Sequence, residues 1–213
     1  PDEDCIASMV AVSLILSKFY KDTAVFLSST IHEHFDYLLR ICRYNSIALA
    51  GSVREIPKYI DTVIVCDTPK RSMIESVDLL EPVLSRFGTT VVEIDHHIGG
   101  DGEYIGDEGF RLVTEASSAS ELVGHLAFKL AADRKLLQRF QVNDLFSRNL
   151  VLAVLTGIIG DTNMGSYLKS RRARKYYAYF TTVLNSILVV KTVKETNICL
   201  LYTSDAADDL LCV

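Results

Sequence analysis

The sequence predicts an α/β protein in which a doubly wound, mainly parallel sheet carries helices on both faces. Short apolar segments rich in β-branched residues alternate along the chain with segments whose apolar residues recur at helical spacing, and this alternation is typical of parallel α/β sheets. The strand-like segments are almost continuously apolar, as expected for strands buried on both faces. The 213 residues, 49% of them hydrophobic, can form one sizeable core, or one domain with part of another.

The predicted elements follow one another in a regular order. The first is a helix over 6–20, which is apolar on all sides and is therefore expected to be buried. Apolar runs predict strands at 23–27, 46–50, 62–66 and 89–94. Helical spacing predicts further helices at 31–42, 74–87, 118–140, 145–159 and 169–189. The last residues have no consistent period, so we assign one domain to 1–198 and expect 199–213 to be a non-native tail.

Composition narrows the class of protein. The net charge of -5 argues against a dedicated nucleic-acid coat but allows a local basic patch. None of the five cysteines has C-x-x-C spacing, which favours reduced core thiols and a cytoplasmic location. The apolar run over 150–160 is far shorter than the ~20 residues that a membrane helix needs. We therefore expect no association with a membrane.

Acidic residues and histidines stand where predicted strands and helices begin or end. Asp67 closes the strand TVIVC, and Asp95 closes the strand VVEI and is followed by His96 and His97. All strands of a parallel sheet end at the same edge, so these residues are expected to meet in one crevice. Further carboxylates stand at the start of the first helix and after TGIIG, namely Asp2, Asp4 and Asp161.

Each of these residues also has a purely structural explanation, since aspartate is common in turns and at helix caps. A functional site is favoured because adjacent histidines on a strand point to opposite faces, so that each ring needs its own partner. A group of carboxylates at one edge also repels itself unless cations neutralise it. Carboxylates with a few imidazoles suit Mn²⁺ or Mg²⁺, and two such ions can activate a water for phosphoryl transfer.

Four segments, PDEDCIAS, VIVCDTP, VVEIDHH and TGIIGDT, resemble in their order and spacing the motifs of the DHH phosphoesterase family. The resemblance covers about residues 1–190. The family includes RecJ-type single-strand exonucleases, nanoRNase and pAp phosphatases, cyclic-di-AMP phosphodiesterases and manganese inorganic pyrophosphatases. It implies the catalytic α/β domain of a two-metal phosphoesterase.

The resemblance also implies a role for each matching residue. Two Mn²⁺ ions, or Mg²⁺ in their place, would be bound by carboxylates and one histidine. His97 would face the substrate phosphate and Asp67 would bridge both ions, which makes these two residues the catalytic candidates. Asp95 would orient a histidine from behind. The metal ligands would be Asp2 at the first ion, Asp4, His96 and Asp161 at the second, and Asp67 at both.

The sequence departs from the family pattern at several points. The first motif of the family begins with a metal-binding histidine on a strand before Pro-Asp, and we expect this first strand and histidine to be missing from the chain. We also expect the C-terminal DHHA1-type substrate domain to be absent. Ala7 and Asn163 stand where the family usually has glycine.

Other residues are weaker candidates for substrate binding. Ser117 and Ser118 precede a helix, and Ser118-x-x-Glu121 fits a capping box. Capping would explain both serines, although the resemblance implies that this segment lies near the active site. Arg171 and Arg172 belong to the run KSRRARK, which could attract phosphate, although such runs are usually solvated helix faces. Gly99, Gly100 and Gly102 are expected to form a loop beside the site.

The sequence therefore predicts a Mn²⁺-dependent phosphoesterase. Its expected substrates are phosphodiesters or phosphomonoesters of small nucleotides or short oligonucleotides, and the protein could be a homodimer. One alternative is an inorganic pyrophosphatase. The other is a non-catalytic nucleotide-binding or regulatory module on the same fold, which the altered Ala7 and Asn163 would suggest.

Overall fold

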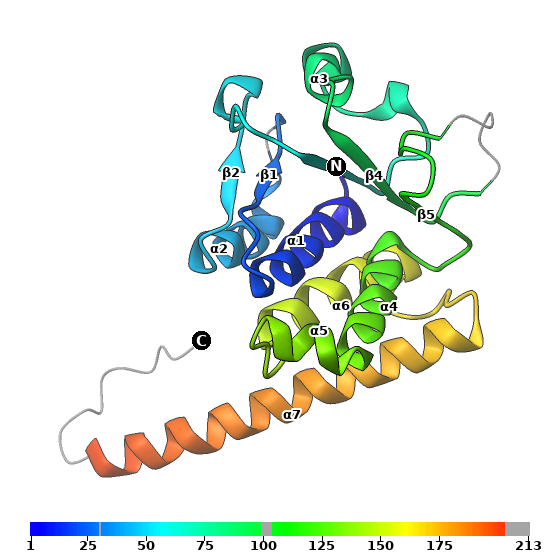
Figure 1. Ribbon diagram of the computed structural model, residues 1–213. Coiled ribbons are helices and arrows are strands. Elements are labelled where there is room, and N and C mark those ends of the chain that lie inside the picture. Colours follow the sequence, from blue (N-terminus) through cyan, green and yellow to red (C-terminus); the bar gives the residue numbers. More distant parts are fainter. Residues whose placement is uncertain (30, 99–103, 203–213) are drawn as a thin grey trace.

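The computed structural model describes residues 1–29, 31–98 and 104–202 (Figure 1). The expected glycine loop at 99–102 and most of the predicted tail at 199–213 lie outside these residues. Within them, no helix has both the length and the apolar character needed to cross a membrane.

Within the described ranges, five short strands form two parallel sheets, which confirms the α/β fold class with parallel strands flanked by helices. The smaller sheet pairs β1 with β2, and the larger has the order β3-β4-β5. The strands are β1 (Ala24–Phe26), β2 (Ala48–Ala50), β3 (Thr62–Cys66), β4 (Thr90–Asp95) and β5 (Arg111–Val113). Among the described residues, no ladder joins the two sheets. β5 was missed, because a three-residue strand gives little periodic signal.

A central helix, α1 (Glu3–Lys18), separates the sheets from a layer formed by the helices that follow β5 in the chain (Figure 1). It packs against β1, β3 and α2 and, most extensively, against α4 and α6. Its apolar residues are buried on all sides, as the sequence predicted. The other α-helices are α2 (Asp36–Tyr44), α3 (Val77–Leu84), α4 (Ala119–Ala132), α5 (Arg134–Arg139), α6 (Arg148–Thr162) and α7 (Arg171–Tyr202).

Both faces of β3 and β4 are covered by apolar side chains. Ile64 and Ile94 face the main core, which also contains α1, α4 and α6. Val63 and Val91 on the opposite face belong to a smaller cluster with Leu84 of α3. Burial on both faces explains why these strands are continuously apolar in sequence.

Several predicted helices have different bounds in the structure. The helix expected over 118–140 is interrupted at Asp133, whose side chain accepts a hydrogen bond from Leu136 N and so caps α5. The helix expected from residue 31 begins as a 3₁₀ turn, Glu33–Phe35. Single 3₁₀ turns also occur at Val53–Glu55 and Arg71–Met73. α7 continues to Tyr202, past the predicted domain boundary at 198.

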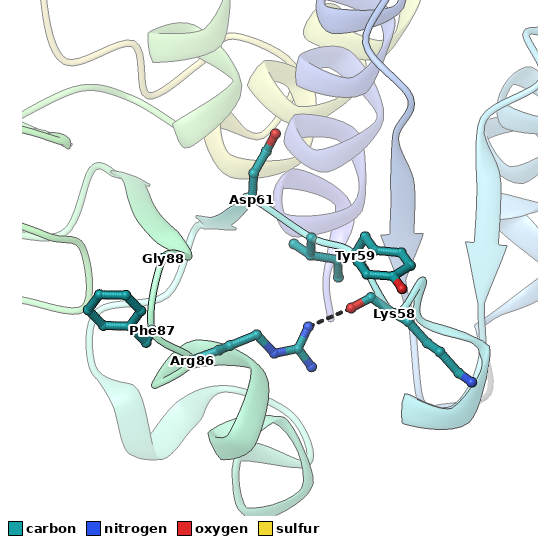
Figure 2. A pocket seen from close by; sticks show the side chains of 7 residues that line it. Lys58, Tyr59, Asp61, Arg86, Phe87 and Gly88 are labelled. Carbon is teal, nitrogen blue, oxygen red and sulfur yellow. Dashed lines mark hydrogen bonds between the residues drawn. The ribbon is translucent and has the colours of Figure 1, made fainter.

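A shallow pocket of about 280 Å³ lies where β3 and β4 begin (Figure 2). It is lined by residues 58–61 and 86–88, and Arg86 spans it by donating from Nη1 to the carbonyl oxygen of Lys58 at 2.8 Å. The acidic motifs follow the opposite, carboxyl ends of these strands. This pocket is therefore separate from the candidate metal centre.

Candidate metal centre

The candidate site forms where β3 and β4 end. Cys66 pairs with Ile94 in the parallel ladder, and Asp67 N donates to the carbonyl oxygen of Ile94 at 2.9 Å. This register places Asp67 beside the residues that close β4. The topological argument made from sequence therefore describes this part of the site correctly.

Asp67 adopts a left-handed backbone conformation with φ of 51°. Few residues other than glycine take this conformation, but aspartate and asparagine tolerate it better than most. The Asp67 side chain is only 5% exposed. Its Oδ1 atom accepts no hydrogen bond of standard geometry from any described residue and has only the ion-pair contacts with the histidines after β4 among them. A buried carboxylate oxygen without a donor is costly, and a cation would satisfy it.

His96 points into the protein. Its Nε2 lies 3.2 Å from Asp67 Oδ1 and 3.2 Å from Asp161 Oδ2, and its Nδ1 lies 3.4 Å from the carbonyl oxygen of Ala116. Burial by itself would lower the pKa of His96, but the carboxylates of Asp161 and Asp67 outweigh it and raise the pKa to about 10. Without a metal ion, a protonated His96 therefore neutralises part of the acidic cluster.

The His97 ring lies beside the His96 ring, with centroids 4.2 Å apart, but its side chain is 46% exposed. Its Nδ1 lies 2.8 Å from Oδ1 of the buried Asp95 and 3.8 Å from Asp67 Oδ1. The hydrogen bond with Asp95 leaves His97 Nε2 as the ring nitrogen that can meet an incoming ligand. The two rings therefore differ in burial and in hydrogen-bond partner, but they do not point to opposite faces as expected, because both follow β4 and lie near Asp67 Oδ1.

Asp4 enters the site from the first turn of α1 and is fully buried. It does not cap its own helix, since that role belongs to Asp2, which accepts from Cys5 N at 3.0 Å. Instead the Asp4 carboxylate accepts N–H groups of Ala119 and Ser120 at the start of α4. Burial and, next, the charge of Asp67 raise the pKa of Asp4 to about 7.

Two groups of possible metal ligands result, and they share His96. One contains Asp67, His96 and His97, and the other contains Asp4, His96 and Asp161. Within each group the ligand atoms lie within 4.8 Å of one another. Oxygen-rich sets with a few imidazoles suit Mn²⁺ or Mg²⁺. Together with the unpartnered oxygen of Asp67, this donor chemistry fits divalent cations.

Asp2 is the proposed ligand that the structure keeps outside both groups. It is exposed and serves as the N-cap of α1. Its assignment to the first ion remains a prediction. The other proposed ligands, Asp4, Asp67, His96 and Asp161, do come together.

The two serines already have partners within the protein. Ser118 Oγ accepts a hydrogen bond from Glu121 N, and Ser117 Oγ accepts one from Lys169 N. The carboxylate of Glu121 accepts from Ser117 N at 2.7 Å. These contacts favour the structural interpretation, in which the serines shape the start of α4.

Arg171 and Arg172 differ in their contacts with the rest of the protein. Arg172 lies with Nε 3.4 Å from Oε1 of the buried Glu121 and donates from Nη2 to the carbonyl oxygen of Glu115. Arg171 is exposed at the first residue of α7. Arg172 thus joins α7 to α4, and substrate binding by either arginine remains a prediction.

Sequence reasoning missed the residues that surround the ligands. The backbone N–H groups at 119 and 120 and the Ala116 carbonyl group contact Asp4 and His96. The capping box at Ser118 correctly marked the start of a helix. The resemblance implied that this segment lies near the active site, but not that its N–H groups hold Asp4, which is more than a hundred residues away.

The sequence matches the family model described as "DHH family, N-terminal domain" over residues 1–158. The chain belongs to the DHH family. Proteins of this family are in general metal-dependent phosphoesterases. None of the curated proteins matches the sequence.

A solved structure shares the fold of this DHH protein. It is an exopolyphosphatase-related protein from Bacteroides fragilis, 18% identical in sequence, with a TM-score of 0.63. The match covers 85% of this chain and 49% of the other. The chain therefore spans about half the length of that neighbour.

Proposed function

We propose that this DHH protein is a cytoplasmic phosphoesterase that hydrolyses phosphodiester or phosphomonoester bonds in small nucleotides or short oligonucleotides. The observation that carries the proposal is the pair of ligand groups that share His96 at the ends of β3 and β4. Membership of a family of metal-dependent phosphoesterases supports it. Two Mn²⁺ ions, or Mg²⁺ in their place, are the cofactors that this donor set fits.

Some residues of the site would bind the cations, and another would contact the substrate. Asp4, His96 and Asp161 would hold one ion. Asp67, whose Oδ1 lies 3.2 Å from His96 Nε2, would contact that ion and a second one. When bound, such ions activate a water and neutralise the attacking and leaving oxygens.

His97 is placed to meet the substrate. Its ring is half-exposed, and the buried carboxylate of Asp95 holds its Nδ1. With a proton on each ring nitrogen, His97 donates from Nδ1 to Asp95 and from Nε2 to a phosphate oxygen, and so stabilises the negative charge that develops there.

A pyrophosphatase is the second candidate, since the fold neighbour carries the name of an exopolyphosphatase-related protein. Pyrophosphate and phosphate esters would use the same ions and the same histidine, so substrate choice must come from contacts outside this cluster. The alternative of a non-catalytic binding module was based partly on Asn163, and the structure weakens that reason. Asn163 occupies a left-handed position with φ of 47° at the end of α6, and asparagine is a frequent substitute for glycine there.

Hydrolysis assays with metal-free protein would test the proposal. Bis-p-nitrophenyl phosphate, p-nitrophenyl phosphate, a short oligonucleotide and pyrophosphate would each be offered with Mn²⁺, with Mg²⁺ and with EDTA. We expect Mn²⁺-dependent release from an ester substrate, and loss of that release in Asp67→Asn. Cleavage of pyrophosphate alone would identify a pyrophosphatase, and absence of turnover despite Mn²⁺ binding would support a binding module. The same preparation on a sizing column would test the possible homodimer.

A further inference from the structure

The carboxylate of Asp4 is fixed by the first turn of α4. Ala119 N donates to Oδ2, and Ser120 N donates to Oδ1 at 2.9 Å. These bonds set the plane of the carboxylate and leave acceptor sites free, since a carboxylate offers about four. The start of α4 therefore holds Asp4 in place for the ligand group that it forms with His96 and Asp161.

The facing helix, α6, carries no side chain at this point. A Cβ atom at Gly157 would lie 2.3 Å from Asp4 Oδ1 and 2.0 Å from Ser120 Oγ, closer than real Cβ contacts. Asp4 and Ser120 are both fully buried, so neither side chain could turn away into solvent. Gly157 thus leaves open the space that these two oxygens border.

The hydroxyl group of Ser120 makes no hydrogen bond of standard geometry with the residues that the structure describes, but it lies close enough to the Asp4 carboxylate to offset part of the rise that burial causes in the pKa of that group. A buried hydroxyl without a partner is unfavourable and uncommon. The hydroxyl can rotate, and it offers one donor. Asp4 Oδ1 is the acceptor that borders the same space beside Gly157.

We propose that Ser120 is a positioning residue for the metal-binding carboxylate of Asp4, in the space that Gly157 keeps open. The inference rests on the proposed metal centre and adds to it a support that comes from α4 and α6. The Ser120 hydroxyl donates to the negatively charged Asp4 carboxylate that a cation requires, and so offsets the repulsion from Asp67. Ser120 itself contacts neither substrate nor cation in this arrangement.

Calorimetric titration of metal-free protein with Mn²⁺ would test the role of Ser120. Ser120→Ala should weaken Mn²⁺ affinity by about tenfold or more, the range seen when a group behind a metal ligand is removed. The melting temperature of the metal-free variant should change little, because the hydroxyl makes no hydrogen bond of standard geometry there. Ser13→Ala, which changes another buried serine at the far end of α1, should leave the affinity unchanged.

A pair of glycine variants would test the space itself. A Cβ at Gly157 meets the carboxylate, whereas a Cβ at Gly124 would lie 2.9 Å from an atom of the Phe180 ring in the core. Both changes crowd a buried helix, but only Gly157→Ala should weaken Mn²⁺ binding strongly. Gly124→Ala should lower the melting temperature and keep the affinity.

The outcomes separate this inference from the proposed function. Wild-type protein that binds Mn²⁺ alongside a Ser120→Ala variant with unchanged affinity would overturn the positioning role alone. Equal affinities of Gly157→Ala and Gly124→Ala would overturn the role of the open space. Wild-type protein that binds no Mn²⁺ would overturn the metal centre and this inference with it.

Discussion

At the scale of single residues, the site depends on residues with an unfavourable backbone conformation or an unfavourably buried carboxylate. Asp67 combines a left-handed backbone with a buried oxygen that lacks a donor. Asp4 places a carboxylate in a fully buried position. Such arrangements persist only where the surrounding structure enforces them, and they are concentrated at functional sites. Cation binding would relieve both, which makes these residues sensitive places for substitution.

Asp67→Asn should separate metal binding from structure. Asparagine tolerates the left-handed conformation and keeps the size of the side chain, and loss of attraction to His96 is offset by relief of repulsion from Asp4. The metal-free stability should therefore change by less than about 1 kcal/mol. Mn²⁺ at about 100 times its dissociation constant stabilises a native protein by ~2.7 kcal/mol, and the variant should lose most of this gain.

Thermal melts of both proteins, with and without Mn²⁺, would measure this difference. A variant that is less stable without metal but keeps the full Mn²⁺ shift would show that Asp67 only shapes the turn after β3.

Asp95→Asn should affect turnover more than metal binding. The buried Asp95 contacts His97 Nδ1 at 2.8 Å and belongs to neither ligand group. An asparagine amide would hold the ring less firmly and would favour the wrong tautomer if its NH₂ faced Nδ1. We expect kcat to fall by about tenfold to a hundredfold, with Mn²⁺ affinity close to that of the wild type. A steady-state assay and a calorimetric titration of the same sample would check this, and a loss confined to Mn²⁺ affinity would contradict it.

At the scale of helices and strands, the sequence predicted well what depends on local pattern. β3 was placed at its observed bounds because TVIVC is β-branched and lies between polar turns. β5 was missed because its pairing with β4 makes it a strand, and its own three residues do not. The break at Asp133 depends on a single capping side chain within a continuous helical pattern.

In the site, too, some contacts follow from sequence pattern and topology, and others depend on packing between distant elements. Asp67 and the residues after β4 could be brought together from topology alone, because parallel strands end at one edge. The contact between Asp4 and the start of α4 depends on how α1, α4 and α6 pack, and on Gly157 where α6 faces Ser120. Packing of this kind has no periodic signature in the sequence.

Glu121→Ala should loosen the attachment of α7 to α4. Glu121 is 1% exposed, accepts from Ser117 N and lies 3.4 Å from Arg172 Nε. Removing its carboxylate leaves a buried N–H without an acceptor and Arg172 without its partner, at a cost of about 2 kcal/mol or more. Arg172→Ala should cost less, because the arginine side chain is 43% exposed and Glu121 keeps the hydrogen bond from Ser117 N. Urea unfolding of both variants would measure the order, and a larger loss in Arg172→Ala would contradict it.

At the scale of the whole molecule, the acidic cluster joins separate parts of the fold. Asp4 comes from α1, Asp67 and His96 follow β3 and β4, and Asp161 belongs to the last turn of α6. All four elements contribute side chains to the main core, in which α1 is the central helix (Figure 1). The protonation state of the cluster should therefore influence global stability.

The metal-free protein should lose stability as pH rises. The pKa of Asp4 is raised to about 7 and that of His96 to about 10 in the folded state. A folded state with raised pKa values binds more protons than the unfolded chain, so its stability falls with increasing pH. The contribution of Asp4 should disappear between about pH 4 and 7, and that of His96 between about pH 6.5 and 10.

Mn²⁺ should reverse this dependence. Metal ligands must be deprotonated to bind, so the cation replaces the protons on Asp4 and His96 and binds more tightly at higher pH. Urea midpoints measured in EDTA at pH 5.5, 7 and 8.5 should decline, and the extra stability given by Mn²⁺ should grow over about the same range. The decline above pH 7 should be weaker in His96→Asn, which lacks the titrating ring. A metal-free midpoint that rises from pH 7 to 8.5 would show that His96 is neutral in the folded protein and that the carboxylates are balanced in some other way.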